Sequence, residues 1–482
     1  MLISKFNKCQ SIQGYRMFAN TNKIPLVSKT LFFFIILAYL PTIFFRYIGE
    51  EANYTIMSME MFQHQEYWHV YALGGEGGRP PLYNWLMIPL SQLLGWSHVL
   101  IAARIITLGA TFGTAWGLGW LARKLWPHTR SGWIASSLYL LTLDVLYYRG
   151  WLAYADPLFS FFMVWSMAYL WIACRQQSTT KVFWAMVFIF LSYLTKVFTA
   201  YVFLGSVWLI LLLHKPYRTF LLKPSTIFVS LLGLSPWFGW MYWIGSHDSI
   251  QASWQLTDLT HKTTHFSGFL PYLRKLFQFP LSVMIGLLPS SGILLFDLWK
   301  NKNASHTLEQ KLLLGMFAIN FLPYWLAPDS AIRYVLPSYG FIVLGATYAI
   351  LNSSIPSFYL HWSKLITGLG LINNFMLFPL YQHYVRGQNY EIMAQKIQAQ
   401  YPHQTLFCTN YTSIGLSIVA TLDGQNISAP AITTPTLHSI GIDIAETPHD
   451  VPGVPLPFLT VNDESTAIIC LGQQCAPKAS RF

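Results

Sequence analysis

Long apolar segments recur along the first 380 residues and constrain the fold more than any other feature. Only 10% of the residues are charged, against roughly 25% in soluble proteins, while 54% are hydrophobic and 17% aromatic. Runs of about 17 to 25 apolar residues are typical of membrane-spanning helices. The sequence therefore predicts an all-α polytopic membrane protein with about 11 transmembrane helices. These lie near residues 28–46, 97–121, 131–148, 156–174, 182–195, 197–214, 225–245, 280–298, 312–327, 334–351 and 364–382.

Basic residues collect on one predicted side of the membrane. If residues 1–27 form a cytoplasmic leader, 17 of the 30 basic residues share its side with only two acids, Asp297 and Glu309. This is the positive-inside rule, and it accounts for the formal charge of +11 without nucleic acid. The leader is long and no small-residue cleavage pattern follows the first run, so we interpret that run as a retained anchor rather than a signal peptide.

Residues 383–482 lack long apolar runs and predict a small α/β domain after the transmembrane region, 28–382. An odd number of spans would place this domain outside the cytoplasm. Its pattern predicts a helix with Tyr390, Met393 and Ile397 on one face, strands in "QTLFCT" and "TAIICLG", and a helix in "SIGLSIVATLDG". It also holds three cysteines, of which two could pair in an oxidising compartment; Cys408, Cys470 and Cys475 leave the pairing open.

The predicted outer-face loop, 47–96, begins with two adjacent acids, Glu50 and Glu51. The segment "EEANYTIMSMEMF" predicts a helix with an apolar face, lying along the membrane surface. The simpler interpretation is that acids favour the positive end of a helix dipole. Further along, "GGEGG" is not followed by Gly-Lys-Ser/Thr, which excludes a nucleotide-binding loop. Arg79 precedes two prolines, which fix an extended backbone before another helix.

Several charged residues stand at predicted outer ends of different spans. Each alone could cap a helix or reach the interface, but ionisable groups at membrane depth usually face a polar cavity or one another. Their shared location predicts one outward-facing pocket, in which Glu50 and Glu51 form an acidic wall and Arg79, Lys196 and Arg333 form a cationic wall. The cationic wall suits a phosphate headgroup, and a carboxylate opposite it suits deprotonation of an acceptor hydroxyl. The charged residues at these predicted helix ends are Arg104, Asp144, Arg149, Asp156, Lys196, Asp329 and Arg333.

These motifs, in this order, resemble the GT-C class of integral-membrane glycosyltransferases. The relevant sequences are "EEANY", "GGRPPLYNWL", an Asp-Pro helix start at Asp156, "TK" ending at Lys196, and "RYVLP". The chain is most similar to the bacterial branch with protein O-mannosyltransferases and the lipid A aminoarabinose transferase. That family usually has Asp where this chain has Glu50, and Lys where it has Arg79.

The resemblance implies transfer of a sugar from a polyprenyl-phosphate carrier, with inversion, at the outer face of a bacterial inner membrane. It implies catalytic roles for Glu50, as base or acceptor-positioning group, with Glu51 and Asp156. Substrate binding falls to the remaining candidates, of which Lys196 and the Arg333–Tyr334 pair occupy carrier-phosphate positions. These candidates are Tyr54, Arg79, Arg149, Lys196, Arg333 and Tyr334.

The expected partners are the lipid-linked sugar donor and a lipid, glycan or protein acceptor, with no nucleic acid. No cofactor is assigned, and His64 and His69 near the acids leave a divalent metal open. A transporter or lipid-carrier flippase is the alternative from another class, although such proteins tend to show inverted repeats and midplane charges. A polymerase or ligase of the same fold, or a scaffold without chemistry, also stays open.

Overall fold

The structure is a computed structural model, and it describes most of the chain. The described residues are 29–77, 79–128, 130–247, 257, 260, 268–300, 307–352, 356–385, 389–409, 414–436, 438–445, 454–456, 459–461 and 464–471. The basic leader predicted over 1–27 lies outside them.

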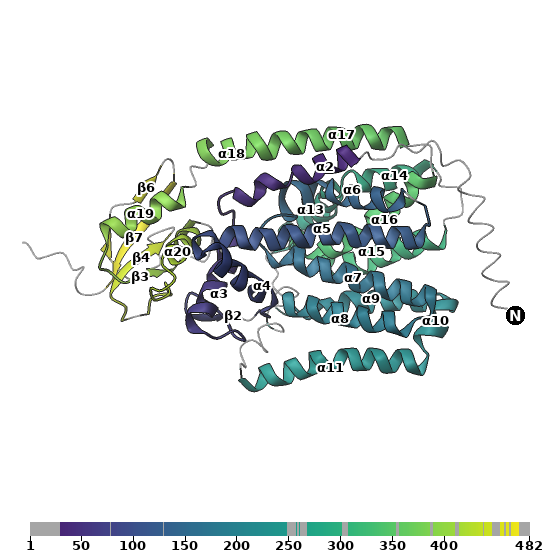
Figure 1. Cartoon of the computed structure of the whole chain (residues 1–482), viewed down its shortest axis with the longest axis horizontal. Helices are drawn as coiled ribbons and strands as arrows, with labels where there is room; N and C mark the ends of the chain where they lie inside the picture. The colour runs from purple at the N-terminus through teal and green to yellow at the C-terminus, as the bar shows by residue number, and fades with distance from the viewer. Residues whose placement is uncertain are drawn as a thin grey trace, which may run out of the picture.

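A bundle of helices forms the larger part of the molecule (Figure 1). Helix is present in every segment predicted to span the membrane. In chain order the helices are α2 (Lys29–Leu37), η2 (Leu40–Phe44), α5 (Val99–Leu125), α6 (Ser131–Leu140), η4 (Val145–Arg149), α7 (Ala155–Gln176), α8 (Thr179–Thr195), α9 (Thr199–Leu212), α10 (Lys215–Leu221), α11 (Pro224–His247), α13 (Phe269–Gly286), α14 (Ser290–Lys300), α15 (Leu308–Leu326), η5 (Ile332–Ser338), α16 (Tyr339–Asn352), α17 (Pro356–Ile372), η6 (Asn373–Leu377), α18 (Phe378–Leu380) and η7 (Tyr381–Val385).

The apolar helices confirm a membrane protein. Within the described residues, four helical stretches are individually long and apolar enough to cross a membrane: Trp96–Leu125, Ala155–Gln176, Pro224–Gly245 and Ile332–Asn352. A fifth crossing results if α13 and α14 are counted as one bent span. The total of eleven spans stays a prediction.

Two predicted straight spans are broken. Between α13 and α14 the chain bends by 100°, whereas the sequence predicted one span over 280–298. Pro289 stands at this break, and proline ends a helix because it has no N–H and its ring clashes with the preceding turn. The predicted span 131–148 is likewise interrupted after Leu140. The two breaks meet, since the amide of Leu143 donates to the carbonyl of Leu288 at 2.9 Å.

The loop after the first helices folds as α3 (Glu51–His64), the hairpin of β1 (Val70–Ala72) and β2 (Gly75–Gly77), α4 (Leu82–Leu94) and η3 (Trp96–His98). Residues from Glu51 to Met61 in α3 are nearly all buried. The expectation of a helix lying on the membrane surface is therefore wrong, because α3 is enclosed by protein. One side faces the bundle and another packs against α20 (Ile414–Gln425).

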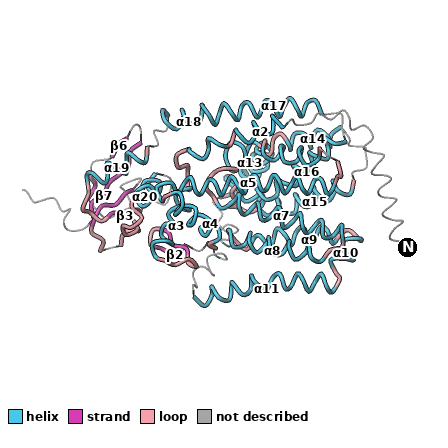
Figure 2. The backbone as a smooth tube through the Cα atoms, viewed as in Figure 1, coloured by secondary structure: helices cyan, strands magenta, loops and turns pink. Residues whose placement is uncertain are grey.

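The C-terminal part lies at one end of the molecule, beyond α3 (Figures 1 and 2). It has the predicted helices, α19 (Tyr390–Gln400) and α20, and a sheet ordered β3-β4-β7-β5, with β6 also paired to β7. The strands are β3 (Leu406–Cys408), β4 (Gly441–Ala445), β5 (Val454–Pro455), β6 (Leu459–Val461) and β7 (Glu464–Leu471). Among the described strands, β3 pairs with β4 in parallel, and β4, β5 and β6 pair with β7 antiparallel. Whether this part is an independent domain stays a prediction.

The C-terminal part is joined to α3 by specific contacts. The amide of Gln63 donates to the carbonyls of Ile427 and Ala429, both at 3.1 Å. A Cβ on Gly424 would lie 2.9 Å from the carbonyl oxygen of Trp96, so α20 can approach η3 only with glycine there. Cys470 is disulfide-bonded, Cys408 keeps its thiol, and Cys475 lies outside the described residues.

Candidate active site

A cavity of about 560 Å³ opens where the ends of several bundle helices meet the N-terminus of α3. One end is lined by charged and tyrosine side chains, and the other runs between α9 and α15 and is mostly apolar. The polar end contains Glu50, Asn53, Tyr54, Arg79, Asp156, Lys196, Asp329, Arg333 and Tyr334. Apolar side chains of α9 and α15, Val202, Phe203, Ile319 and Pro323, form the apolar end together with Ser206 and Asn320. Phe159 and Tyr324 also line the cavity and contact Lys196 and Tyr334 of the polar end. The other lining residues are Val197, Phe198, Thr199, Ala327 and Ser330.

Interruptions of helices place the charged groups. Glu50 is the residue immediately before α3, and Asp156 lies in the first turn of α7. Lys196 is the residue at which α8 ends, three residues before α9 begins. Arg333 belongs to the tight turn of η5. Because these positions follow breaks in the helices, side chains from segments far apart in sequence reach one cavity.

Two ion pairs cross the cavity. The ammonium of Lys196 lies 2.5 Å from Asp156 Oδ1, and both side chains are largely buried. The guanidinium of Arg333 lies 3.2 Å from Glu50 Oε2, and this carboxylate side chain is 47% exposed. Acid and base groups therefore alternate around the polar end, and the Glu50 carboxylate is the more accessible of the two acids.

Aromatic rings support the cations. Arg79 lies over the ring of Tyr54 with 5.0 Å between guanidinium carbon and ring centre, and Lys196 lies 4.7 Å from the ring centre of Tyr334. Arg333 packs over Tyr334 and the neighbouring Tyr154. Such cation–π contacts favour the charged forms and limit the directions in which the side chains can point.

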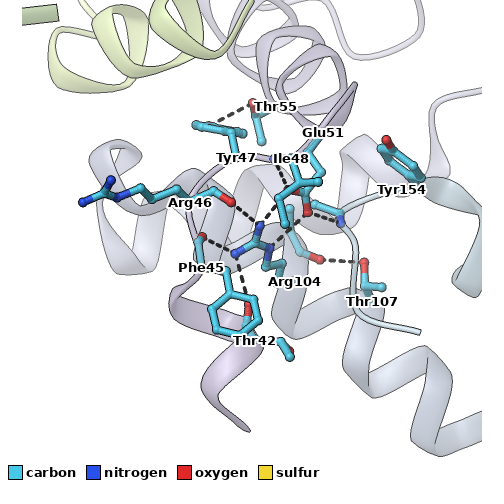
Figure 3. Close-up of polar contacts among 12 residues, drawn as sticks. Thr42, Phe45, Arg46, Tyr47, Ile48, Glu51, Thr55, Arg104, Thr107 and Tyr154 are labelled. Atoms are coloured by element: carbon cyan, nitrogen blue, oxygen red, sulfur yellow. Dashed lines mark hydrogen bonds and ion pairs between the residues drawn. The ribbon is translucent and has the colours of Figure 1, made fainter. Parts of the chain in front are cut away.

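Glu51, for which a catalytic role was predicted, is not among the residues that line the cavity. Its side chain is fully buried and ion-paired with Arg104 of α5, with Nη2 2.6 Å from Oε2. It also accepts hydrogen bonds from the amides of Ile48 (2.8 Å) and Ala153 (2.6 Å). Figure 3 shows this carboxylate surrounded by donors. The geometry gives Glu51 a structural role.

Arg104 ties the start of α3 to the bundle. Besides Glu51, its guanidinium donates to the carbonyls of Thr42 (3.0 Å), Phe45 and Arg46 (2.9 Å) (Figure 3). Thr42 lies in η2, and Phe45 and Arg46 lie in the turn between η2 and α3. The buried arginine therefore fixes the backbone from which Glu50 projects.

Arg149 also stands apart from the cavity lining. It pairs with Asp144 at 2.8 Å, and Asp144 accepts a hydrogen bond from the hydroxyl of Tyr339 at 2.8 Å. The predicted direct contact of Arg149 with substrate is not supported. The other seven predicted site residues line the cavity together.

Some lining residues were not among the predicted site residues. Asn53 lies three positions after Glu50, so helical spacing could have indicated it. Asp329 was recognised only as one of the unusual charges. The pair of Ser206 and Asn320, whose oxygens are 2.6 Å apart, joins α9 to α15 in the apolar end. Nothing in the local sequence signals that pair, because its two residues lie more than a hundred positions apart.

The histidines near the acids serve the hairpin. His69 Nδ1 lies 2.5 Å from Glu66, which also accepts from the hydroxyl of Tyr71 at 2.8 Å. Both hydrogen bonds lower the pKa of Glu66, and the one from Tyr71 has the larger effect. Within the described part of the chain, no three His, Cys, Asp or Glu side chains gather as metal ligands.

Two buried carboxyl groups outside the cavity lining, Glu60 in α3 and Asp423 in α20, are close enough to interact electrostatically. Glu60 accepts from the amides of Leu73 (2.6 Å) and Gly74 (3.1 Å). Burial nevertheless raises its pKa to about 7. Burial, and then the nearby Glu60, raise the pKa of Asp423 well above its ordinary value.

The arrangement can bind an anionic group at the polar end and a hydrocarbon chain at the apolar end. Arginine and lysine suit phosphate oxygens, and the half-exposed Glu50 carboxylate can accept a proton. Apolar side chains between α9 and α15 continue from the charged end. An amphipathic ligand with a phosphate head fits both.

Comparisons with known proteins show a similarity of fold. At the sequence level, no family profile and no curated protein matches the chain. The structure is similar to crystal structures of ArnT from Cupriavidus metallidurans, one bound to undecaprenyl phosphate and one in the apo state. The first has a TM-score of 0.67 and 13% identity over 93% of this chain and 99% of ArnT. The second also has a TM-score of 0.67 and 13% identity, over 91% of this chain and 97% of ArnT.

A weaker likeness, TM-score 0.47 at 12% identity, is to the oligosaccharyltransferase AglB of Archaeoglobus fulgidus, over 84% of this chain and 64% of that one. The likeness to ArnT extends over nearly the full length of both chains. It confirms the resemblance to the GT-C class as a resemblance of fold.

Proposed function

We propose that this protein is an inverting glycosyltransferase that moves a sugar from a polyprenyl-phosphate carrier to an acceptor in the cell envelope. The cavity carries the proposal, because its lining brings three cations and three carboxylates together with apolar side chains of α9 and α15. ArnT, which has the same fold, has been crystallised with undecaprenyl phosphate bound, and this supports the choice of donor.

The donor would lie with its phosphate against Arg79, Lys196 and Arg333 and its first isoprenoid units between α9 and α15. Positive charge at that position stabilises the negative charge that develops on the departing phosphate, which is usually the largest catalytic contribution in such sites. The ion pair with Asp156 holds the ammonium of Lys196 in place. Asp156 is therefore proposed as a positioning residue for Lys196.

Transfer needs one bond to form and one to break. The acceptor oxygen attacks the anomeric carbon from the face opposite the phosphate, and the bond from that carbon to the phosphate oxygen breaks. The electron pair leaves with the lipid phosphate. If the acceptor is a hydroxyl, its proton passes to Glu50; if it is a phosphate oxygen, no proton moves and Glu50 orients the acceptor instead. Inversion follows from the single displacement.

The reaction is assigned to the extracytoplasmic face of a bacterial inner membrane. Two observations support this. The basic loops indicate the opposite face as cytoplasmic, and the disulfide at Cys470 is typical of an oxidising compartment. The C-terminal part packs against α3 and thus lies on the same side as the cavity.

Transfer from a lipid extract tests the proposal. We expect Glu50→Gln and Lys196→Ala to abolish transfer of labelled sugar while the purified variants keep their fold and insert into membranes. Matched controls are Glu391→Gln and Lys223→Ala, which make the same changes at exposed positions outside the cavity. Full transfer by both cavity variants would overturn the site assignment.

The acceptor can be identified by mass spectrometry of lipid A, envelope polymers and exported proteins from cells with and without the chain. A sugar that is lost from one of these fractions, and is restored by the wild-type chain but not by Glu50→Gln, would name it. Movement of the carrier lipid across vesicles without any sugar transfer would instead favour a flippase.

A further inference from the structure

The ion pair between Glu50 and Arg333 raises a question about the proposed reaction. The same arginine is proposed to hold the donor phosphate, and the same glutamate is proposed to receive the acceptor. In the structure the two groups contact each other at 3.2 Å. We propose that this pair is a latch that the donor phosphate opens, so that the donor must bind before Glu50 can act on the acceptor. This inference rests on the proposed function.

The two ion pairs of the cavity differ in a way that identifies which of them exchanges. Lys196 and Asp156 are 2.5 Å apart, and their side chains are 15% and 5% exposed. Arg333 and Glu50 are 3.2 Å apart, and theirs are 22% and 47% exposed. A pair whose carboxylate is half-exposed is weakened because water competes for that charge, whereas a buried pair is costly to break. The outer pair is therefore the one that an entering anion can replace.

Arg333 has unused hydrogen-bonding capacity toward a ligand. Its Nη1 donates to Glu50, while Nε is buried and has no hydrogen-bond partner within the described part of the chain. A guanidinium presents its donors in a planar fork that matches two phosphate oxygens. A phosphate that bonds to the guanidinium can thus replace the single bond to Glu50, and it can satisfy the buried Nε when the side chain turns toward it.

Asp156 likewise has an unsatisfied hydrogen-bond acceptor. Its Oδ2 is buried and lacks a hydrogen-bond partner among the described residues, although Oδ1 contacts Lys196. An acceptor or sugar hydroxyl that enters the cavity can donate to this oxygen. The cavity without ligand therefore leaves both a donor and an acceptor unsatisfied, as expected if a ligand with a phosphate and hydroxyl groups completes it.

The exchange would couple donor binding to the availability of the base. While Glu50 is paired with Arg333, its negative charge is partly compensated and one of its oxygens is engaged. When the donor phosphate takes Arg333, the carboxylate is released beside the anomeric carbon. The acceptor then meets an activated donor and an unpaired carboxylate together, which gives a donor-first order of binding.

Binding of undecaprenyl phosphate to the full chain in detergent, compared with undecaprenol, tests this. We expect Glu50→Gln to bind undecaprenyl phosphate more tightly than wild type, by about fivefold, because the competing carboxylate of a half-exposed pair is worth about 1 kcal/mol. The same variant is expected to lose sugar transfer. A gain in donor affinity together with a loss of turnover is a signature that general damage to the site would not produce.

Two further variants show whether the gain acts through Arg333. In an Arg333→Gln background, Glu50→Gln should change affinity little, because the pair is already broken. Asp329→Asn removes one negative charge from the same cavity without touching the pair, and should tighten binding less than Glu50→Gln. Equal tightening by Asp329→Asn, or an undiminished gain in the Arg333→Gln background, would mean that net charge rather than the latch is responsible.

The result separates the two proposals. If wild type binds undecaprenyl phosphate no better than undecaprenol, the phosphate site of the proposed function is wrong. If wild type prefers the phosphate but Glu50→Gln binds it equally or more weakly, the proposed function stands and the latch is overturned.

Discussion

The adjacent acids Glu50 and Glu51 should respond in opposite ways to the same mutation. Glu51→Gln keeps the size of the side chain but removes the charge that balances the buried guanidinium of Arg104. Both carboxylate oxygens of Glu51 accept hydrogen bonds from Arg104 and from the backbone amides of Ile48 and Ala153. In the glutamine variant, the side-chain NH2 group would take the place of one of these oxygens and would stand opposite N–H donors, with which it cannot form a hydrogen bond. We therefore expect a structural defect rather than a chemical one.

The magnitude follows from burial. Removing one partner of a buried ion pair costs about 3–5 kcal/mol, because an uncompensated charge is left in a low-dielectric interior. Glu50 is half-exposed, so Glu50→Gln should cost less than about 1 kcal/mol. Removing Arg104 as well, in Glu51→Gln/Arg104→Met, should restore only part of the loss, since the carbonyls of η2 and of the turn before α3 then lose their donor.

Thermal unfolding in detergent, with transfer activity measured on the folded fraction, distinguishes the two acids. Glu51→Gln should unfold at a clearly lower temperature and keep some activity per folded molecule, whereas Glu50→Gln should unfold like wild type and be inactive. A Glu51→Gln variant of unchanged stability that has lost all transfer would refute the structural assignment and return Glu51 to the catalytic residues.

Three further predictions concern the surroundings of the cavity. Burial raises the pKa values of Glu60 and Asp423, so the folded state holds more protons than the unfolded state. The packing of α20 on α3 is therefore most stable in acid and loses up to about 3 kcal/mol as the pH rises through about 7. Asp423→Asn should flatten this pH dependence in thermal unfolding, and an unchanged pH profile would contradict the prediction. Gly424→Ala should lower the unfolding temperature by pushing α20 away from the carbonyl of Trp96, while an equally stable variant would show that η3 can move aside. Asp156→Asn should weaken the hold on Lys196, the lysine proposed to bind the donor phosphate, and reduce kcat more than it raises KM; a change confined to KM would argue against the proposed positioning role of Asp156.

The outline of the fold could be predicted because apolar periodicity and helix breaks are local. Lys196 in an apolar run indicated the junction of α8 and α9, and Pro157 after Asp156 indicated the start of α7, as observed. The bend at Pro289 was missed because a window average smooths over one proline between two apolar stretches. The burial of α3 was missed because the residues that cover it, in α20, come some 360 positions later, and local amphipathicity cannot reveal a distant partner.

The distinction between the two acids was out of reach for a related reason. Consecutive residues at a helix start point in directions about 100° apart, so one faces the cavity and its neighbour faces α5. Which one does so depends on where the chain enters the helix. Arg104 was the available signal, because a fully buried arginine in an apolar helix requires an acid partner. The sequence around Arg104 does not say which of the two acids is that partner.

The cavity of this chain depends on few positions, which is consistent with a fold shared with ArnT at only 13% identity. The charged groups of the cavity depend on breaks in helices and on one buried anchor, Arg104 with Glu51, rather than on extended sequence patterns. Apolar surfaces of the bundle can be exchanged among leucine, isoleucine, valine and phenylalanine with small cost when total volume is kept, whereas the breaks and the anchor fix where Glu50, Lys196 and Arg333 meet. A segment swap that preserves the breaks but replaces apolar faces should therefore retain binding of undecaprenyl phosphate, and one that restores a continuous helix through residues 196–198 should abolish it.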